Sequence, residues 1–408
     1  MIYSCKSIID TPRNSIVNSF ILINNRIQQE NVMQIDQERL ASLFVTLCEI
    51  DSPSKKEGRV AEYLKSVFQE MGTDVTEDDS ADETGSDCGN LLVRFHGGLE
   101  KEPVFLNCHM DTVLPAEGVT VVRQGEVFAS QGETVLGGDD KAGIAVLVEV
   151  MRTLMENNMA FGPVELVFTT CEEIGLLGVK AFDPTLLKAR IGYALDTTGV
   201  HKIIIGAPAA NRIVAEINGM AAHAGLNPEE GINAIQLAAQ AIAGLELGRL
   251  DSESTANIGL VEGGTATNII PARAVVKGEI RSHSEEKLAA YTEKTKEVFS
   301  RTITNWQDPA GRAQGRPTLD FQVIPDYPVM KLDSNAEVIR RVEQAAAAIN
   351  ADLEFLVAGG GSDANIFNSY GLQCAILSTG MDKVHSTEET IRLSDMVRTA
   401  ELVMAILT

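Results

Sequence analysis

The chain has 408 residues, of which 44% are hydrophobic and 22% charged, and its formal net charge is −23. This length favours two domains, and the composition is typical of a globular protein. The negative charge argues against nucleic acid or an anionic membrane as a partner, and no apolar run approaches the roughly 20 residues of a membrane helix. The six cysteines include no CxxC pair, so we expect no disulfide framework, no cysteine-type zinc site and a cytoplasmic location.

The first 32 residues differ from the rest of the chain. They contain three basic and two acidic side chains, whereas the remainder is strongly acidic. Their apolar stretch 20–23 is too short for the core of a signal peptide. We therefore expect residues 1–32 to form an N-terminal extension and the folded body to begin near residue 33.

Helix-like and strand-like segments alternate in the next part of the chain. Apolar residues recur at helical spacing over 40–48 and 59–71, and the segment 142–155 is apolar on nearly all sides. Short apolar runs typical of buried strands cover 90–95, 103–108, 164–170 and 191–195. This alternation predicts an α/β domain with a mostly parallel sheet and flanking helices.

After Pro208 the order of elements changes. Strands are predicted at 212–217, 256–261, 274–281 and 319–324, and helices at 232–247 and 285–299. Their β-α-β-β-α-β order is that of a ferredoxin-like unit. A helix at 336–349, a strand at 374–378 and a helix at 394–407 then follow. We predict a catalytic domain formed by residues 33–209 and 328–408, interrupted by an inserted α+β domain at 210–327.

Most side chains of metal-ligand type stand where an apolar run ends. These are His109 and Asp111 after 103–108, Glu172 and Glu173 after 164–170, Asp196 after 191–195, and His385 after 374–378. Asp139 follows two glycines and precedes the helix 142–155. Ligands of open α/β sheets collect at the carboxyl ends of the strands. Two imidazoles and several carboxylates gathered there could bind two divalent metals and activate a water, which indicates a hydrolase.

Each of these signals has a simpler explanation when it is taken alone. An H-x-D pair is often structural, Asp139 could cap its helix, paired glutamates are usually solvated, and His385 could be a loop residue. Side chains two apart on an extended segment point the same way, so Asp111 can hold or orient His109. Adjacent side chains diverge, so one glutamate of the 172–173 pair can bind metal while the other transfers protons.

The ordered set of motifs resembles the M20 dinuclear zinc peptidases, and within them the peptidase T branch, over about residues 33–408. The motifs are His109-x-Asp111, Gly-Gly-Asp139-Asp140-Lys141-Ala-Gly, Glu172-Glu173, Asp196 and His385. The resemblance implies a zinc-bearing α/β domain with an inserted ferredoxin-like dimerisation domain. It also implies two divalent ions, with zinc favoured over cobalt or manganese. By similarity, Asp139 bridges the ions, His109 and Asp196 hold one, Glu173 and His385 hold the other, and Glu172 is the general base.

Three further segments resemble parts of the same family. The segment 219–225 resembles the one whose histidine, here His223, reaches the active site of a partner subunit, which implies a homodimer. The segments 263–268, with Asn268, and 279–281, with Arg281, resemble substrate-binding pieces. The glycine-rich segment 359–363, with Gly361 and Ser362, corresponds to a loop on the substrate side. Read without the resemblance, Arg281 could equally form a surface salt bridge or bind a peptide carboxylate in bidentate fashion.

The sequence thus predicts a dinuclear metallo-aminopeptidase that acts on short peptides. One alternative is an M20-type deacylase that cleaves N-acyl amino acids with the same residues. A free-amine tripeptide and an N-acetylated amino acid would distinguish these two enzymes. A second alternative is a catalytically silent metal-binding or regulatory protein. Glu172 argues against it, because a silent site needs no general base.

Overall fold

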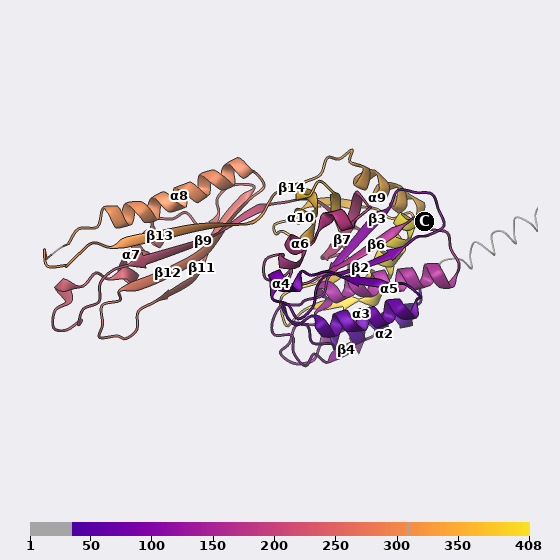
Figure 1. Cartoon of the computed structure of the whole chain (residues 1–408), viewed down its shortest axis with the longest axis horizontal. Coiled ribbons are helices and arrows are strands. Elements are labelled where there is room, and N and C mark those ends of the chain that lie inside the picture. Colours follow the sequence, from indigo (N-terminus) through magenta and orange to yellow (C-terminus); the bar gives the residue numbers. More distant parts are fainter. Residues whose placement is uncertain (1–34, 309) are drawn as a thin grey trace, which may run out of the picture.

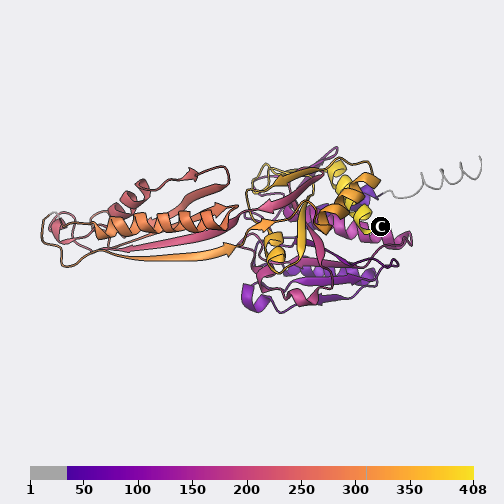
Figure 2. The same ribbon diagram turned by 90° about the horizontal axis from the view of Figure 1, so that it is seen from above.

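The computed structural model describes residues 35–308 and 310–408, so the predicted extension 1–32 lies outside the described residues. The described chain forms two lobes joined by a pair of strands (Figures 1 and 2). One lobe holds a nine-stranded sheet and a small four-stranded sheet, and the other holds a five-stranded sheet. Within the described ranges, no helix is long and apolar enough to cross a membrane.

The nine-stranded sheet is the centre of the larger lobe. Its strands, in spatial order, are β1 (Val75–Glu77), β2 (Leu91–Phe95), β6 (Val164–Thr169), β3 (Val104–His109), β7 (Ile191–Thr197), β16 (Gln373–Ser378), β8 (Lys202–Ala207) and β14 (Met330–Lys331), and β15 (Glu354–Val357) also pairs with β8. The four central strands β6, β3, β7 and β16 run parallel, and antiparallel strands lie toward both edges. The predicted α/β class is confirmed.

Helices cover both faces of this sheet. One face packs against α2 (Gln37–Cys48), α3 (Gly58–Glu70), α5 (Gly138–Glu156), α9 (Glu337–Ala348) and α11 (Leu393–Leu407). The other packs against α6 (Leu177–Ala181) and α10 (Asp363–Ser369), and the short α4 (Ala81–Thr84) contacts α6. Successive strand residues alternate between two cores: Leu106 and Cys108 of β3 face one, and Phe105 faces the other. Burial on both faces explains why these strands read as continuous apolar runs.

The smaller lobe is the predicted ferredoxin-like unit. Its antiparallel sheet has the order β10 (Gly248–Arg249), β11 (Ser254–Gly263), β12 (Arg273–Ser282), β9 (Ala209–Asn218) and β13 (Thr318–Tyr327). The helices α7 (Ala234–Ala243) and α8 (Glu285–Thr304) pack on the sheet and share a core with it. Figure 1 shows this lobe extending away from the larger one, with β14 at the junction.

Besides elements that were not predicted at all, such as β8 and β15 of the central sheet and α10, two features of the structure differ from the sequence-based expectation. The helix predicted at 232–247 is shorter, because the side chain of Asn233 caps its start by accepting from Gln236 N at 2.9 Å, and Gly244 follows its last residue. The second feature is an unpredicted four-stranded sheet of β17 (Met381–Asp382), β18 (Thr390–Arg392), β5 (Val127–Ser130) and β4 (Val121–Gln124). Its strands are short and lack a clear alternation, so they carry little periodic signal.

One buried ion pair fastens α2 to α5. The Arg39 guanidinium binds Glu149 in bidentate fashion, with Nε–Oε2 and Nη2–Oε1 distances of 2.7 and 2.8 Å, and Glu149 is fully buried. We expect Arg39→Leu to lower the free energy of unfolding by about 3 kcal/mol, because it leaves a buried carboxylate without its cation. The matched control is Arg123→Leu, whose exposed partner Glu38 lies on the surface; its cost should stay below about 1 kcal/mol. Urea unfolding measures the free energy of unfolding of both variants. Equal losses would show that the burial of Glu149 does not determine how much stability is lost.

Candidate metal centre and pocket

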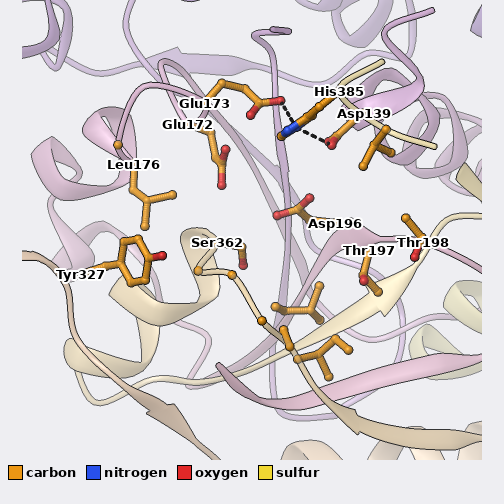
Figure 3. Close-up of a pocket in the computed structure, with 18 of the residues that line it drawn as sticks. Asp139, Glu172, Glu173, Leu176, Asp196, Thr197, Thr198, Tyr327, Ser362 and His385 are labelled. Atoms are coloured by element: carbon orange, nitrogen blue, oxygen red, sulfur yellow. Dashed lines mark hydrogen bonds and ion pairs between the residues drawn. The ribbon is translucent and has the colours of Figure 1, made fainter. Parts of the chain in front are cut away.

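The candidate ligands come together at one end of the central sheet. They are His109 at the end of β3, Glu172 and Glu173 after β6, Asp196 near the end of β7, Asp139 at the start of α5, and His385 between β17 and β18. Because β6, β3 and β7 are adjacent and parallel, their carboxyl ends meet at the same edge. Figure 3 shows Glu172, Glu173, Asp196 and His385 converging there, with dashed lines from His385 to Glu173 and Asp139.

Asp139 lies between the two imidazoles. Its Oδ1 is 3.0 Å from His109 Nε2, and its Oδ2 is 3.3 Å from His385 Nε2. His385 Nε2 also lies 3.0 Å from Glu173 Oε1. Each oxygen of Asp139 therefore faces a different histidine, which is the arrangement that a carboxylate shared by two cations requires.

The backbone around Asp139 is shaped for this position. Gly137 has a φ of 73°, and Asp139 (φ −81°, ψ 103°) departs from helical geometry inside α5. The carboxylate of Glu389, which is only 2% exposed, accepts from Gly137 N at 2.8 Å and from Asp139 N at 3.0 Å. Thr112 Oγ1 donates to Asp139 O at 3.2 Å. Asp139 thus does not cap the helix, and its side chain is held toward the histidines.

Asp111 supports two ligand segments at once. It is fully buried, and its carboxylate accepts from Glu172 N at 2.9 Å, Glu173 N at 3.2 Å and Ser54 Oγ at 2.7 Å. His109 Nδ1 lies 3.0 Å from the backbone oxygen of Asp111 and 3.4 Å from its Oδ1. The backbone oxygen is thus the nearer partner of the imidazole, and Nε2 is left facing Asp139.

The two histidines are the positive partners of the buried carboxylates. Burial alone would lower the pKa of His109, but its hydrogen bonds to Asp111 and Asp139 raise it well above the usual range. The hydrogen bonds of His385 to Asp139 and Glu173 raise its pKa to about 10. Burial alone would raise the pKa of Asp139, but its bonds to both histidines hold it below the usual range.

Other acidic groups are compensated only in part by the charge of His109. Burial raises the pKa of Glu172 well above its usual range, and the negative charges of Asp196 and Glu173 raise it further. Burial and the charge of Asp139 raise the pKa of Asp196 in the same way. Burial also raises the pKa of Asp363, to about 6. Carboxylates crowded in this way are stabilised in their ionised form by added positive charge.

The donor set fits divalent metal ions. Ligand atoms of His109, Asp139 and Glu173 all lie within 4.8 Å of one another. Among the described residues, no hydrogen bond to the carboxylate of Asp196 is found, so its oxygens stay available. Imidazole nitrogen together with carboxylate oxygen suits zinc, manganese and related ions. Metal binding requires both imidazoles in their neutral form, so it would compete with protonation of the histidines.

A pocket of about 540 Å³ opens beside this cluster. Glu172, Glu173 and His385 lie on one side, and Ser362 and Tyr327 lie across from them (Figure 3). Arg281 and Gly361 also line this pocket. The structure therefore places three of the four predicted substrate-side residues next to the candidate metal ligands.

The chain does not bring His223 and Asn268 to this pocket. Both are exposed in the smaller lobe, in segments that meet through a bridge between His223 and Ile269 and a hydrogen bond from Ala224 N to Asn268 O at 3.0 Å. His223 Nδ1 accepts from Gly225 N at 3.1 Å. Neither residue lines the pocket of its own chain.

Two supporting residues were missed by sequence reasoning. Glu389 holds the turn before α5, as described above. Glu57, which is fully buried, accepts from Cys171 N at 2.9 Å and so fixes the turn that precedes Glu172. Cys171 adopts a φ of 53° there. No local pattern distinguishes Glu57 or Glu389 from a surface glutamate, and only their contacts reveal the role.

An open α/β sheet that gathers imidazoles and carboxylates at its strand ends, beside a pocket, has the architecture of a metal-dependent hydrolase. Residues 105–408 match the model of peptidase family M20/M25/M40. The crystal structure of aminopeptidase PepT from Bacillus cereus is 38% identical with a TM-score of 0.80, and the match covers 91% of this chain and 98% of that one. A tripeptidase from Staphylococcus aureus is 34% identical with a TM-score of 0.85, covering 92% and 98%. The YqjE protein of Bacillus subtilis is 39% identical over 374 residues, covering 91% of this chain and 98% of that protein. The chain therefore belongs to peptidase family M20/M25/M40.

The contacts of Asp111 generate a prediction about metal affinity. Asp111→Asn replaces one accepting oxygen by a donor, so it cannot accept from both glutamate backbones and Ser54 as before. We expect metal affinity to fall about 10- to 100-fold, as is common when a group that orients metal ligands is changed. Ser54→Ala is the control, because it removes one bond to Asp111 and keeps the carboxylate. Competition with a chelating dye measures both affinities, and a wild-type value for Asp111→Asn would disprove the role.

Proposed function

We propose that this protein is a dinuclear zinc aminopeptidase that releases the N-terminal residue from short peptides. Metal-dependent peptide hydrolysis is the activity of its family, and two solved relatives above 30% identity bear the names aminopeptidase and tripeptidase. The observation that carries the proposal is the position of Asp139, whose two oxygens each face a different histidine beside the buried Glu172.

These contacts support the ligand roles that the family resemblance implies. We assign Asp139 as the bridge, His109 and Asp196 to one ion, and Glu173 and His385 to the other. The His385–Glu173 distance of 3.0 Å supports the second pair. The position of Asp196 near the end of β7, next to the strand that bears His109, supports the first. Three carboxylates and two histidines are more ligands than one tetrahedral zinc needs.

The remaining residues carry out the proton transfers and the binding. Divalent metals at such a site supply a Lewis acid and a water of lowered pKa. Glu172 points into the pocket and binds no cation in the ligand scheme, so its carboxylate takes the proton of the attacking water and then gives it to the leaving amine. Asp111 holds the backbone of Glu172 and thereby fixes the position of this base.

The far side of the pocket suits the carboxyl end of a short peptide. Arg281 lines it, and its Nη1 donates to Gly359 O at 3.3 Å, which leaves part of the guanidinium free for a substrate carboxylate. Gly361 and Ser362 line the same pocket and would contact the peptide backbone. Arg281 also pairs with Glu279 at 3.0 Å, which is the salt bridge of the simpler interpretation, while the binding of a peptide carboxylate is part of our proposal.

We further propose that the active form is a homodimer joined through the inserted domain. His223 and Asn268 lie far from the pocket of their own chain, and they could enter a site only from a partner or after large domain closure. His223 would then stabilise the oxyanion of the attacked carbonyl. A reducing cytoplasmic setting agrees with the five described cysteines, which are all free and buried.

A substrate panel tests the proposed activity. Protein reconstituted with zinc should hydrolyse free-amine tripeptides and release the N-terminal residue, and a chelator should abolish the turnover. The same preparation should leave N-acetylated amino acids unchanged. Cobalt and manganese are assayed in parallel. Turnover of the acetylated compounds in preference to tripeptides would show a deacylase instead, and a metal-bound protein without any turnover would show a binding protein.

Two adjacent variants serve as controls for this panel. Glu172→Gln should keep about two metals per chain and lose kcat by about 100-fold or more, because it removes the general base. Glu173→Gln should instead weaken metal binding. Metal content by elemental analysis separates the two phenotypes, and an exchange of phenotypes would reverse the assigned roles.

Subunit complementation tests the place of His223. Loss of an oxyanion donor typically costs about 100- to 1000-fold in kcat, so the His223→Ala chain should be nearly inactive. Mixing it with a Glu172→Gln chain and allowing exchange should restore activity, since a mixed dimer contains one complete site. Subunit exchange is verified independently with labelled chains. If exchange occurs and no activity returns, His223 does not act across the interface.

A further inference from the structure

The two lobes are connected by two chain segments that run side by side. One passes from β8 through Pro208 into β9, and the other leaves β13 and passes through Pro328 into β14. β8 pairs with β14 and β9 pairs with β13, so the prolines mark the break between the two sheets. Proline has no N–H group to donate, and ladder bonding is interrupted at this point. Because the two ladders stop on either side of the prolines, the carbonyl groups of both prolines need donors from elsewhere.

Asn365 supplies both donors. Its Nδ2 donates to Pro208 O at 3.1 Å and to Pro328 O at 2.7 Å. The residue lies in α10 of the larger lobe and is fully buried. Figure 1 shows α10 beside β14, at the junction of the lobes. A single amide thus ties both connections to the catalytic domain.

The oxygen of the same amide binds the loop that lines the pocket. Asn365 Oδ1 accepts from Ser362 N at 3.1 Å, and Ser362 Oγ accepts from Ala364 N at 3.2 Å. These bonds cap the start of α10 and fix the loop 359–362, which lines the pocket. The amide therefore makes three hydrogen bonds. Two go to the connections between the lobes, and the third comes from the loop on the substrate side of the pocket.

The inserted domain contacts this loop directly as well. Arg281 of β12 donates to Gly359 O, and Tyr327, the last residue of β13, packs on Gly361. A Cβ atom at Gly361 would lie 2.4 Å from the ring of Tyr327, so a glycine is required there. The loop consequently lies between two elements of the inserted domain and the amide of Asn365.

We propose that Asn365 is a positioning residue that couples the orientation of the inserted domain to the substrate-side loop of the active site. A rotation of that domain moves the carbonyl groups of Pro208 and Pro328, and the rigid, planar amide then changes the hydrogen bond that holds Ser362. The proposal deepens the peptidase function proposed above and rests on it. The alternative is that Asn365 only satisfies two buried carbonyl groups and so contributes stability alone.

The kinetic test compares two asparagines of one helix. Asn365→Asp has nearly the same shape but cannot donate to either carbonyl. Asn368→Asp is the matched control, because Asn368 also donates to two backbone carbonyl groups, and these belong to Ala364 and Cys374 rather than to a connection or the loop. For a tripeptide, Asn365→Asp should raise KM about 10-fold with kcat changed less than about 3-fold, since the loop affects substrate binding rather than the metal ligands. Metal content should stay at the wild-type value in both variants.

A distance measurement tests the coupling without any substrate. Spin labels on Glu102→Cys and Lys296→Cys, both exposed, report the distance between the lobes in a Cys5→Ser background. The other native cysteines are buried and should not react. The distance distribution should broaden in Asn365→Asp and remain that of the parent in Asn368→Asp. This readout stays informative if the wild-type protein hydrolyses no peptide, so failure of the proposed function and failure of the coupling are distinguishable.

The KM values and the distance distributions together test the proposed coupling. A broadened distribution with raised KM supports the coupling. An unchanged distribution overturns it, and so does a broadened distribution with wild-type KM. If Asn365→Asp and Asn368→Asp have equal effects on KM and on the distance between the lobes, Asn365 only contributes stability. If Asn365→Asp does not fold, Asn365→Ser takes its place, because a hydroxyl can donate to only one of the two carbonyl groups, and the same outcomes apply.

Discussion

Repulsion between buried carboxylates at the ends of β6, β3 and β7 is the constraint on which this structure depends. Asp139, Glu172, Glu173 and Asp196 lie at the same end of the sheet, and burial together with mutual repulsion disfavours ionisation of several of them. An acidic cluster of this kind is stable only with strong positive charge inside it. The histidines can provide part of that charge, and the geometry is suited to cations that provide more.

The side chains in this cluster are held mainly through the backbone. Asp111, Glu389 and Glu57 are themselves buried carboxylates, and each accepts N–H groups from the segment that bears a ligand or the base. This arrangement fixes the backbone of the candidate ligands, as groups that orient metal ligands commonly do. It also adds further negative charge around the site, which strengthens the attraction for divalent cations.

Sequence patterns were sufficient for the fold class and for finding the candidate ligands at strand ends. Buried parallel strands read as apolar runs, so the position of His109 or Asp196 directly after such a run was visible. The supporting residues were not visible in this way. Glu388 and Glu389 form a pair like Glu172 and Glu173, yet the side chain of Glu388 is 73% exposed and binds Lys383, while Glu389 is buried against α5. Asn365 likewise has no local signature, because its role depends on two prolines that are distant in sequence.

The insertion of one domain within another has a consequence for the synthesis of the protein. A growing chain acquires His109, Asp139, Glu172, Glu173 and Asp196 before the inserted domain, and His385 and Glu389 after it. Until the later segment emerges, β16 is missing beside β7 and one of the two imidazoles is absent. A partly translated chain therefore has an incomplete set of the proposed ligands, even if its inserted domain has already folded as a unit. On this assignment, hydrolytic activity is delayed until the segment that carries His385 has been made.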